Sequence, residues 1–117
     1  MDSSARGLLW DALRSADNIR QFVEGRTPED YLADRLLRSA VERQFTIVGE
    51  ALSKLSKLTP TVAGRIPALR EIISFRNLLI HGYAAISDAR VWHIVEHDLL
   101  PLRASIESLL TELGGPP

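Results

Sequence analysis

Apolar residues recur every three or four positions along most of this chain, which is the period of an α-helix that buries one side. No stretch alternates apolar and polar residues in the way that predicts a half-buried β-strand. The pattern therefore predicts an all-α fold, an antiparallel bundle of four to five helices. We expect a single domain over residues 1–113 and a flexible glycine- and proline-rich tail over residues 114–117.

Glycine, proline and capping residues divide the first half of this pattern. A first helix is predicted over about residues 4 to 24, and Gly25 ends it. The stretch 27–30, Thr-Pro-Glu-Asp, is typical of a helix start, with a hydroxyl cap, proline at the first position and acids in the first turn. A short helix and then a long one are expected to follow, to about Leu58.

The second half is predicted to hold a connection over residues 59–67 and two further helices. The fourth helix runs to about His81, where Gly82 can supply a left-handed stop. Ser87 caps the last helix, and Pro101 is expected to kink it because proline deletes a backbone donor and clashes with the preceding turn.

Polar side chains gather at the end of the predicted fourth helix. Arg76 lies at the centre of its apolar stripe, while Asn77 and His81 share one flank and Tyr83 projects almost in line with Arg76. The stripe consists of Leu69, Ile72, Ile73, Leu79 and Ile80. A guanidinium keeps its proton and is costly to bury without a partner, so we expect a negative group to meet Arg76.

Two interpretations of Arg76 follow from its chemistry. In the first it pairs inside the fold, and Gln44, at the centre of the long helix's stripe, is the most plausible partner. In the second it binds phosphate oxygens while His81 exchanges protons near neutral pH. An imidazole for the 2′-hydroxyl or leaving-oxygen proton and a guanidinium for the charge on phosphorus suffice to cleave RNA without a metal. Asn77 and Tyr83, so close by, favour this second interpretation.

The pattern Arg-Asn-x-x-x-His-x-Tyr, at Arg76, Asn77, His81 and Tyr83, resembles the HEPN signature in the form found in HepT toxins. Further agreement comes from Phe22-Val23-Glu24-Gly25, Val48-Gly49-Glu50-Ala51, Val91-Trp92 and Asp98-Leu99-Leu100-Pro101-Leu102. The resemblance covers nearly the whole chain. Small departures are Ala68, where members often carry tryptophan, and His97, where many have asparagine.

This resemblance implies a HEPN-like helical domain that is a metal-independent endoribonuclease without a cofactor. It would be the toxin of a type VII-like toxin–antitoxin system in a bacterium or archaeon. Arg76 would bind and stabilise the scissile phosphate, His81 would act as general acid or base, and Asn77 would orient the site. The implied partner is an MntA-like nucleotidyltransferase antitoxin, which would silence the toxin by transferring AMP to Tyr83.

Two alternatives remain open. One is a non-catalytic HEPN helical module that binds nucleotide or scaffolds a nucleotidyltransferase, which the net charge of −1 favours slightly. The other is a structural bundle in which Arg76 pairs with Gln44 or a carboxylate. The sequence favours the enzyme because Arg76, Asn77, His81 and Tyr83 are all present, whereas a scaffold needs none of them.

Composition and charge restrict the number of domains, the cellular compartment and the mode of RNA binding. A chain of 117 residues allows one domain, and the absence of cysteine excludes disulfides and thiolate metal sites, which suits a reducing cytoplasm. No apolar run approaches the roughly 18 residues of a membrane span, so we expect a cytoplasmic protein without a membrane partner. Because the net charge is −1, RNA binding has to be local rather than spread over a basic surface.

Two other candidate sites are weaker. His93 and His97 lie four apart on a helix, but two imidazoles without a third ligand do not make a metal site, so we expect a solvated face and no metal. Glu50 could order Arg76 or His81, although an ordinary surface charge is the equal or better interpretation.

A homodimer or higher homo-oligomer is also expected. Leu78 projects opposite the apolar stripe, which is compatible with a dimer contact. Arg76 and His81 are about 140° apart around one helix, so a single motif is loosely arranged. A twofold interface would bring two copies of the pair into one cleft facing the RNA.

Overall fold

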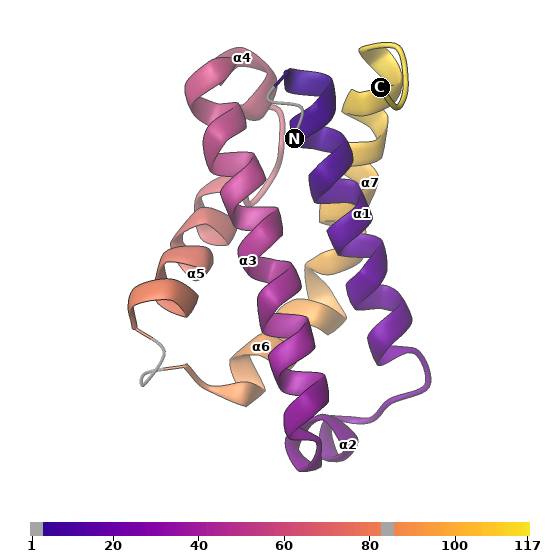
Figure 1. The fold of residues 1–117 in the computed structure, drawn as a ribbon, viewed down its shortest axis with the longest axis vertical. Coiled ribbons are helices and arrows are strands. Elements are labelled where there is room, and N and C mark those ends of the chain that lie inside the picture. Colours follow the sequence, from indigo (N-terminus) through magenta and orange to yellow (C-terminus); the bar gives the residue numbers. More distant parts are fainter. Residues whose placement is uncertain (1–3, 83–85) are drawn as a thin grey trace.

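The computed structural model describes residues 4–82 and 86–117, and all regular secondary structure in these ranges is helical. The helices are α1 (Ala5–Val23), α2 (Pro28–Ala33), α3 (Arg35–Leu58), α4 (Pro60–Ala63), α5 (Leu69–His81), α6 (Asp88–His97) and α7 (Leu99–Glu112). The long helices run antiparallel to their neighbours (Figure 1). The predicted all-α bundle is therefore confirmed.

Helix α3 is the centre of the arrangement. Helices α1 and α5 lie on either side of it, and α7 lies against α1, with α6 and α7 forming the layer behind α3 in Figure 1. Helix α5 is attached to the bundle mainly through α3. The helix that carries the polar motif therefore stands at the side of the bundle, with one long face open.

Local hydrogen bonds begin α2 and α3 where the sequence predicts a short helix and a long one. The Thr27 side chain accepts from the Asp30 backbone N–H at 3.1 Å, and the Asp30 carboxylate accepts from the Thr27 N–H at 3.0 Å. This reciprocal pair is a capping box, which satisfies two helix-end donors at once. Asp34 then begins α3 by accepting from the backbone N–H of Leu37 at 3.0 Å.

The sequence predicts four to five helices, whereas the described ranges hold seven, because the predicted connection contains a helical turn and the predicted last helix is divided. A single turn, α4, forms inside the predicted connection. The predicted last helix breaks at Asp98 instead of kinking at Pro101. Pro101 then stands in the first turn of α7, where a backbone N–H would have no helical partner to lose.

The predicted end of α5 is right in position and wrong in conformation. Gly82 follows the last helical residue, His81, with φ −123° and ψ 33°, which is not the left-handed conformation expected of a glycine stop. Its N–H donates to the carbonyl of Leu78 at 2.8 Å, so the last turn closes without a positive φ.

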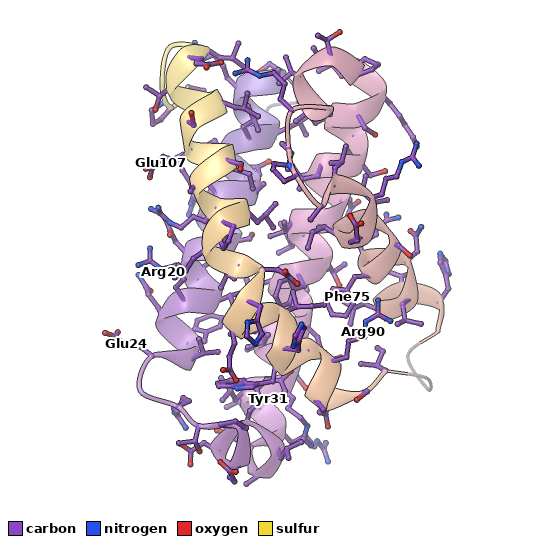
Figure 2. All side chains as sticks on the ribbon, turned by 180° about the vertical axis from the view of Figure 1, so that it is seen from behind. Arg20, Glu24, Tyr31, Phe75, Arg90 and Glu107 are labelled. Atoms are coloured by element: carbon purple, nitrogen blue, oxygen red, sulfur yellow. The ribbon has the colours of Figure 1, made fainter. Side chains whose placement is uncertain are left out.

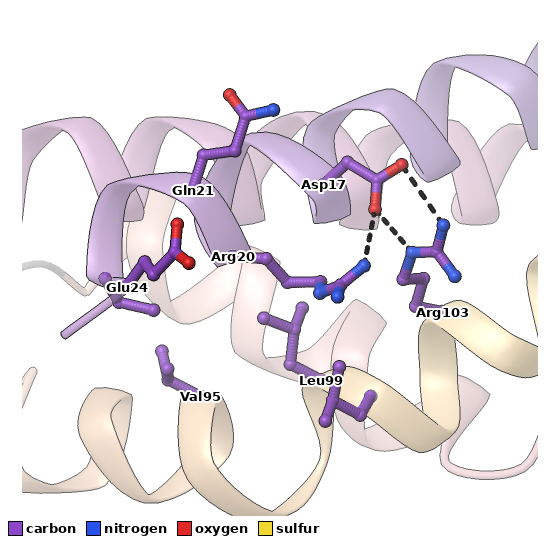
Figure 3. A pocket seen from close by; sticks show the side chains of 9 residues that line it. Asp17, Arg20, Gln21, Glu24, Val95, Leu99 and Arg103 are labelled. Atoms are coloured by element: carbon purple, nitrogen blue, oxygen red, sulfur yellow. Dashed lines mark hydrogen bonds and ion pairs between the residues drawn. The ribbon is translucent and has the colours of Figure 1, made fainter.

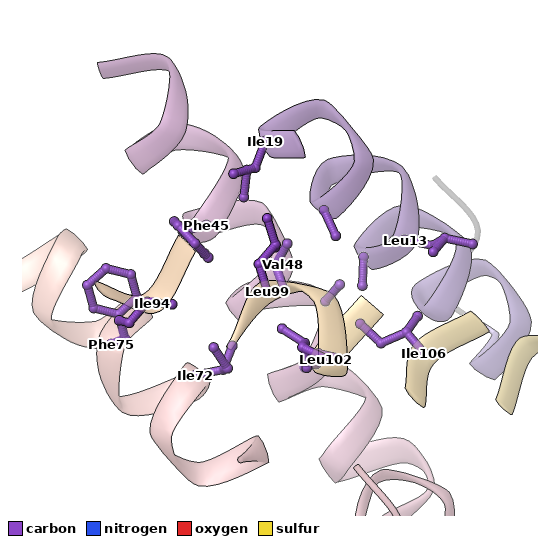
Figure 4. Packing of buried hydrophobic residues seen from close by; sticks show 14 of the residues in the cluster. Leu13, Ile19, Phe45, Val48, Ile72, Phe75, Ile94, Leu99, Leu102 and Ile106 are labelled. Carbon is purple, nitrogen blue, oxygen red and sulfur yellow. The ribbon is translucent and has the colours of Figure 1, made fainter. Parts of the chain in front are cut away.

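The hydrophobic core fills the space between the helices (Figure 4). Its largest fully buried side chains come from all the long helices: Leu8, Leu9 and Ile19 of α1, Val41, Phe45, Val48, Leu52 and Leu55 of α3, Phe75 of α5, and Leu99 and Ile106 of α7, together with Tyr31 of α2. Phe45 and Phe75 meet edge to face, with ring centroids 5.4 Å apart and planes at 76°, a favourable aromatic geometry.

This aromatic contact sets the rotation of α5. The face of α5 that is buried therefore differs from the predicted apolar stripe. The buried residues of α5 are Ile72 and Phe75, whereas Ile80, which the stripe places inside, is 39% exposed. Phe75 lies outside the predicted stripe, yet its ring is the largest apolar surface on the helix. Burying that ring turns the helix so that Arg76 lies at the edge of the buried face instead of its centre.

A cluster at the α2 end of the bundle, where Tyr31 lies (Figure 2), contacts the start of α6. The rings of Tyr31 and Trp92 are tilted at 40° with centroids 5.4 Å apart, and the Arg38 guanidinium lies 3.7 Å from the Asp88 carboxylate. Burial, with Glu42 and Asp88 nearby, raises the pKa of the Tyr31 phenol far above its usual range. Burial and then Asp88 also raise the pKa of Glu42, against the opposing effect of Arg38. The cluster joins the start of α6 to α2 and α3.

Arg6 contacts the chain's last residues. Its Nε donates to the carbonyl of Gly115 at 3.1 Å, and its Nη2 donates to that of Pro116 at 2.8 Å. The predicted flexibility of residues 114–117 stays a prediction. None of the helices in the described ranges is both long enough and apolar enough to cross a membrane.

The raised pKa of Glu42 predicts how stability depends on pH. The folded state holds the Glu42 proton more tightly than the unfolded chain, so stability falls as pH rises through the titration of this group. We expect Glu42→Gln to unfold at a higher denaturant concentration than the wild type at neutral pH. The gain should shrink as the pH falls below the ordinary glutamate pKa, where both states are protonated.

Urea unfolding followed by circular dichroism over this pH range measures the effect. Glu96→Gln, at an exposed position of α6, is the control for losing one negative charge. A Glu42→Gln variant that is less stable than the wild type at neutral pH would show that attraction to Arg38 outweighs burial.

Candidate active site

The motif occupies the last two turns of α5. Asn77 and His81 are both exposed and share one flank, as their spacing predicts, and Arg76 is half-buried beside them. The predicted modification site, Tyr83, lies outside the described residues. The structure therefore presents an amide and an imidazole to solvent next to a partly sheltered guanidinium.

The stem of Arg76 lies directly on Gly49 of α3. A Cβ placed on Gly49 would stand 2.2 Å from the Arg76 Cβ, 2.7 Å from its Cγ and 3.4 Å from the Ile72 carbonyl oxygen. Real carbon atoms do not approach so closely, so a glycine is required at this point of contact. The site therefore rests on a residue of the central helix as well as on the motif itself.

Gly49 belongs to the stretch Val48-Gly49-Glu50-Ala51 of the family resemblance, from which no role was predicted for it. A signal was present, since an interior glycine destabilises a helix by roughly 1 kcal/mol relative to alanine and implies a packing reason. The sequence does not say which residue makes that close approach, because Gly49 and Arg76 belong to different helices.

The guanidinium of Arg76 has no anionic partner among residues 4–82 and 86–117. Its Nη1 donates to the side-chain oxygen of Asn77 at 2.9 Å, and its buried Nε has no hydrogen-bond partner. A buried donor without a partner costs about 1–3 kcal/mol. The Arg76 charge is thus turned toward the surface with part of its hydrogen-bonding capacity unused.

The alternative partner Gln44 is already engaged. Its Oε1 accepts from Nδ2 of Asn18 at 3.1 Å, a bond that joins α3 to α1 instead of α3 to α5. The interpretation in which Gln44 holds Arg76 inside the fold is therefore wrong. Asn77 orients the guanidinium but, being neutral, leaves its charge uncompensated.

His81 is the last residue of α5, and its side chain is exposed. Among the described residues it makes no hydrogen bond to Arg76, consistent with their separation of about 140° around the helix. Glu50 does not order either residue, since its carboxylate lies 3.9 Å from Lys54 Nζ on the next turn of α3. The surface-charge interpretation of Glu50 is the one that fits.

The apolar surface beside the motif differs from the prediction. Leu78 is only half exposed, and its Cδ1 would stand 2.8 Å from a Cβ on Gly82, so this side chain covers the helix end. Ile80 is instead the large apolar residue of α5 that faces solvent. A contact between two copies through this helix would therefore use Ile80 before Leu78.

The remaining candidates show no site of comparable chemistry. The rings of His93 and His97 lie 4.4 Å apart, but the described ranges contain no group of three or more potential metal ligands. A groove of about 540 Å³ lies between α1 and the α6–α7 layer (Figure 3). Its Arg20 and Arg103 both bond to Asp17, so it offers no free cation for phosphate. None of the described motif residues lines it.

Comparison with known proteins adds evidence of a different kind. A family model described as "Ribonuclease HepT-like" matches residues 12–109, the segment that contains both Gly49 and the motif. A Thermococcus cleftensis protein named "Probable ribonuclease HepT" is 29% identical over 93% of this chain and 98% of its own length.

Relatives in Methanocaldococcus jannaschii agree with this match. "Putative RNase MJ1380" is 28% identical over 87% of this chain and 93% of its own length. "Putative RNase MJ1216" is 24% identical over 94% of this chain and 90% of its own length. No solved structure gives a significant match.

The contact between Gly49 and Arg76 predicts a coupled mutational effect. Gly49→Ala should lower the free energy of unfolding by about 1–3 kcal/mol because the new methyl group overpacks the α3–α5 contact. In an Arg76→Gly background, which removes the opposing Cβ and Cγ, the cost of Gly49→Ala should largely disappear. Urea unfolding of the four proteins of this double-mutant cycle measures the coupling. Additive effects would contradict the close approach.

Proposed function

Because the chain belongs to the HepT-like ribonuclease family, we propose that it is a metal-independent endoribonuclease that acts as the toxin of a type VII-like toxin–antitoxin system. The observation that carries the proposal is the state of Arg76. Its stem lies on Gly49 and its guanidinium bonds to Asn77, with no internal anion within the described ranges. The exposed His81 follows it by five residues, about 1.4 helical turns.

Cleavage of RNA through its own 2′-hydroxyl requires only proton transfer and stabilisation of the charge that develops on the phosphate oxygens. The ribose 2′-oxygen attacks the neighbouring phosphorus, and the bond between phosphorus and the 5′-oxygen breaks. The products are a 2′,3′-cyclic phosphate and a 5′-hydroxyl. His81 takes the 2′-hydroxyl proton or gives a proton to the leaving 5′-oxygen. Arg76 binds the phosphate oxygens and stabilises the charge that develops on them, and the Asn77 side chain keeps its fork oriented.

A homodimer or higher homo-oligomer fits this chemistry better than a single copy. One proton must be removed and another delivered on opposite sides of the phosphorus, whereas each chain supplies one motif histidine, His81, diverging from Arg76 by about 140°. Two copies related by a twofold axis would place two guanidiniums and two imidazoles around one strand. Exposed Ile80 offers an apolar contact at that surface.

We further propose that an MntA-like nucleotidyltransferase antitoxin silences the enzyme in the cytoplasm by AMP transfer to Tyr83. The phenol oxygen would attack the α-phosphorus of ATP, and pyrophosphate would leave. The added adenylate brings bulk and negative charge two residues from His81, where the RNA phosphate has to bind. Repulsion and steric exclusion would then act together against the substrate.

The role of His81 gives the first test. Unmodified wild-type protein incubated with total RNA in EDTA should produce fragments ending in cyclic phosphate, and His81→Ala should cleave at least about a hundredfold more slowly. His97→Ala, another exposed histidine, should cleave like the wild type. Gel electrophoresis measures cleavage, and circular dichroism checks that the variants fold.

RNA left intact by wild type whose Tyr83 is unmodified by mass would contradict the ribonuclease. The non-catalytic HEPN module, which the net charge of −1 favours slightly, would then be the better account. That module would still bind a nucleotidyltransferase after His81→Ala.

The role of Tyr83 gives an independent test. Incubation of the wild type with ATP and an MntA-like nucleotidyltransferase should add the mass of one adenylyl group and abolish cleavage. Tyr83→Phe should cleave RNA, gain no mass and remain active with the transferase present. An adenylylated Tyr83→Phe protein would place the modification on another residue.

A further inference from the structure

A second, smaller groove lies between α1 and α3, and neither the motif nor its proposed chemistry uses it. It encloses about 170 Å³ and is lined by two residues of α1 and five of α3. We propose that it holds one nucleotide of the single-stranded RNA, away from the scissile phosphate, and so contributes to substrate binding and base preference. This inference rests on the ribonuclease proposed above.

The groove combines an apolar floor with charged edges. Leu8, Ile47 and Ala51 form the apolar floor. Leu8 and Ala51 are buried, so the half-buried Ile47 is the apolar surface on which the face of a nucleobase can pack. Arg43 and Lys54 come from the same face of α3, eleven residues or about 16 Å apart along the helix axis. An apolar surface between cations suits a nucleotide, which has an apolar base face and an anionic phosphate.

Two of the four charged residues that line the groove form an ion pair with each other, and the other two do not. Lys54 lies 3.9 Å from Glu50, so these two charges largely compensate one another. Arg43 is exposed, and within the described ranges neither Arg43 nor Asp11 of α1 makes a hydrogen bond or an ion pair. A free guanidinium and a free carboxylate therefore remain in the groove.

These two free groups have different uses toward a nucleotide. The Arg43 guanidinium can bind phosphate oxygens. The Asp11 carboxylate only accepts hydrogen bonds, so it would repel phosphate and select the donor edge of a base. Adenine, cytosine and guanine carry an exocyclic amine, whereas uracil does not. The groove is thus expected to disfavour uracil.

Its position relative to Arg76 makes one continuous path possible. Gly49, which contacts Arg76 on the α5 side, is followed in α3 by Glu50, which lines the groove on the α1 side. The two sites are separated by roughly the diameter of one helix, about 10 Å. Helix α3 lies between α1 and α5 (Figure 1), so a single strand leaving Arg76 can cross the exposed face of α3 to reach Arg43.

Binding to a labelled single-stranded RNA of eight nucleotides, measured by fluorescence anisotropy at several salt concentrations, tests the proposal. All proteins carry His81→Ala, so that the RNA stays intact. Arg43→Gln should weaken binding about tenfold, and the slope of log affinity against log salt should become shallower by about 0.7, the value for one phosphate contact to a single strand. Arg35→Gln, at an exposed position of the same helix outside the groove, should change neither by much.

The base preference has its own variant. With Asp11 present, oligonucleotides of adenine or cytosine should bind more tightly than oligouridine, and Asp11→Ala should reduce this difference. In otherwise wild-type enzyme, Arg43→Gln should raise KM for RNA with little effect on kcat, because Arg43 does not touch the reacting phosphate.

Failure of the groove and failure of the ribonuclease would give different results in these experiments. Equal effects of Arg43→Gln and Arg35→Gln on affinity and salt slope would overturn the groove while leaving the ribonuclease intact. If Arg43→Gln weakens RNA binding but the wild-type chain never cleaves RNA, the groove would remain and the ribonuclease would be contradicted. An Arg43→Gln variant that loses nucleotidyltransferase binding but not RNA binding would assign the groove to a protein partner and overturn the proposal.

Discussion

The close approach of Arg76 to Gly49 is the constraint on which the site depends. Without a side chain on Gly49, α5 can lie against α3 with the Arg76 stem between them. That contact, together with the edge-to-face pair of Phe45 and Phe75, sets the rotation of α5. The same rotation leaves the guanidinium at the rim of the core and puts His81 in solvent. Packing and chemistry are thus joined in a single helix–helix contact.

This contact leaves an unsatisfied group where a ligand is expected. The buried Nε of Arg76 lacks a partner, and Asn77 supplies only a neutral acceptor. A bundle selected for stability alone would pair this charge with a carboxylate, as it pairs the part-buried Arg103 with Asp17 and the exposed Arg65 with Glu112. Within the described ranges the Tyr31 hydroxyl and Trp92 Nε1 are also buried without a hydrogen-bond partner, but both are neutral, so Arg76 is the charged group among the three. An incompletely satisfied charged group is typical of a functional site.

The bundle fixes the positions of two surfaces, the motif at the end of α5 and the groove between α1 and α3. Helix α3 presents Gly49 toward α5 and the groove with Arg43 toward α1, so one rigid element relates the two surfaces. Beyond the motif, the ion pair of Arg38 and Asp88 joins the start of α6 to α3.

The sequence by itself determined the helices, most of their boundaries and the group of residues at the end of α5. These features depend on local physics, such as the capping box of Thr27 and Asp30 and the periodicity of apolar positions. Only the tertiary structure decided that Phe75 is buried and Ile80 exposed, that Gln44 bonds to Asn18, and that the last helix breaks at Asp98. Only the tertiary structure shows that Gly49 contacts Arg76. Such choices depend on which surfaces of distant segments meet, and a periodic pattern specifies that a face is buried without specifying its partner.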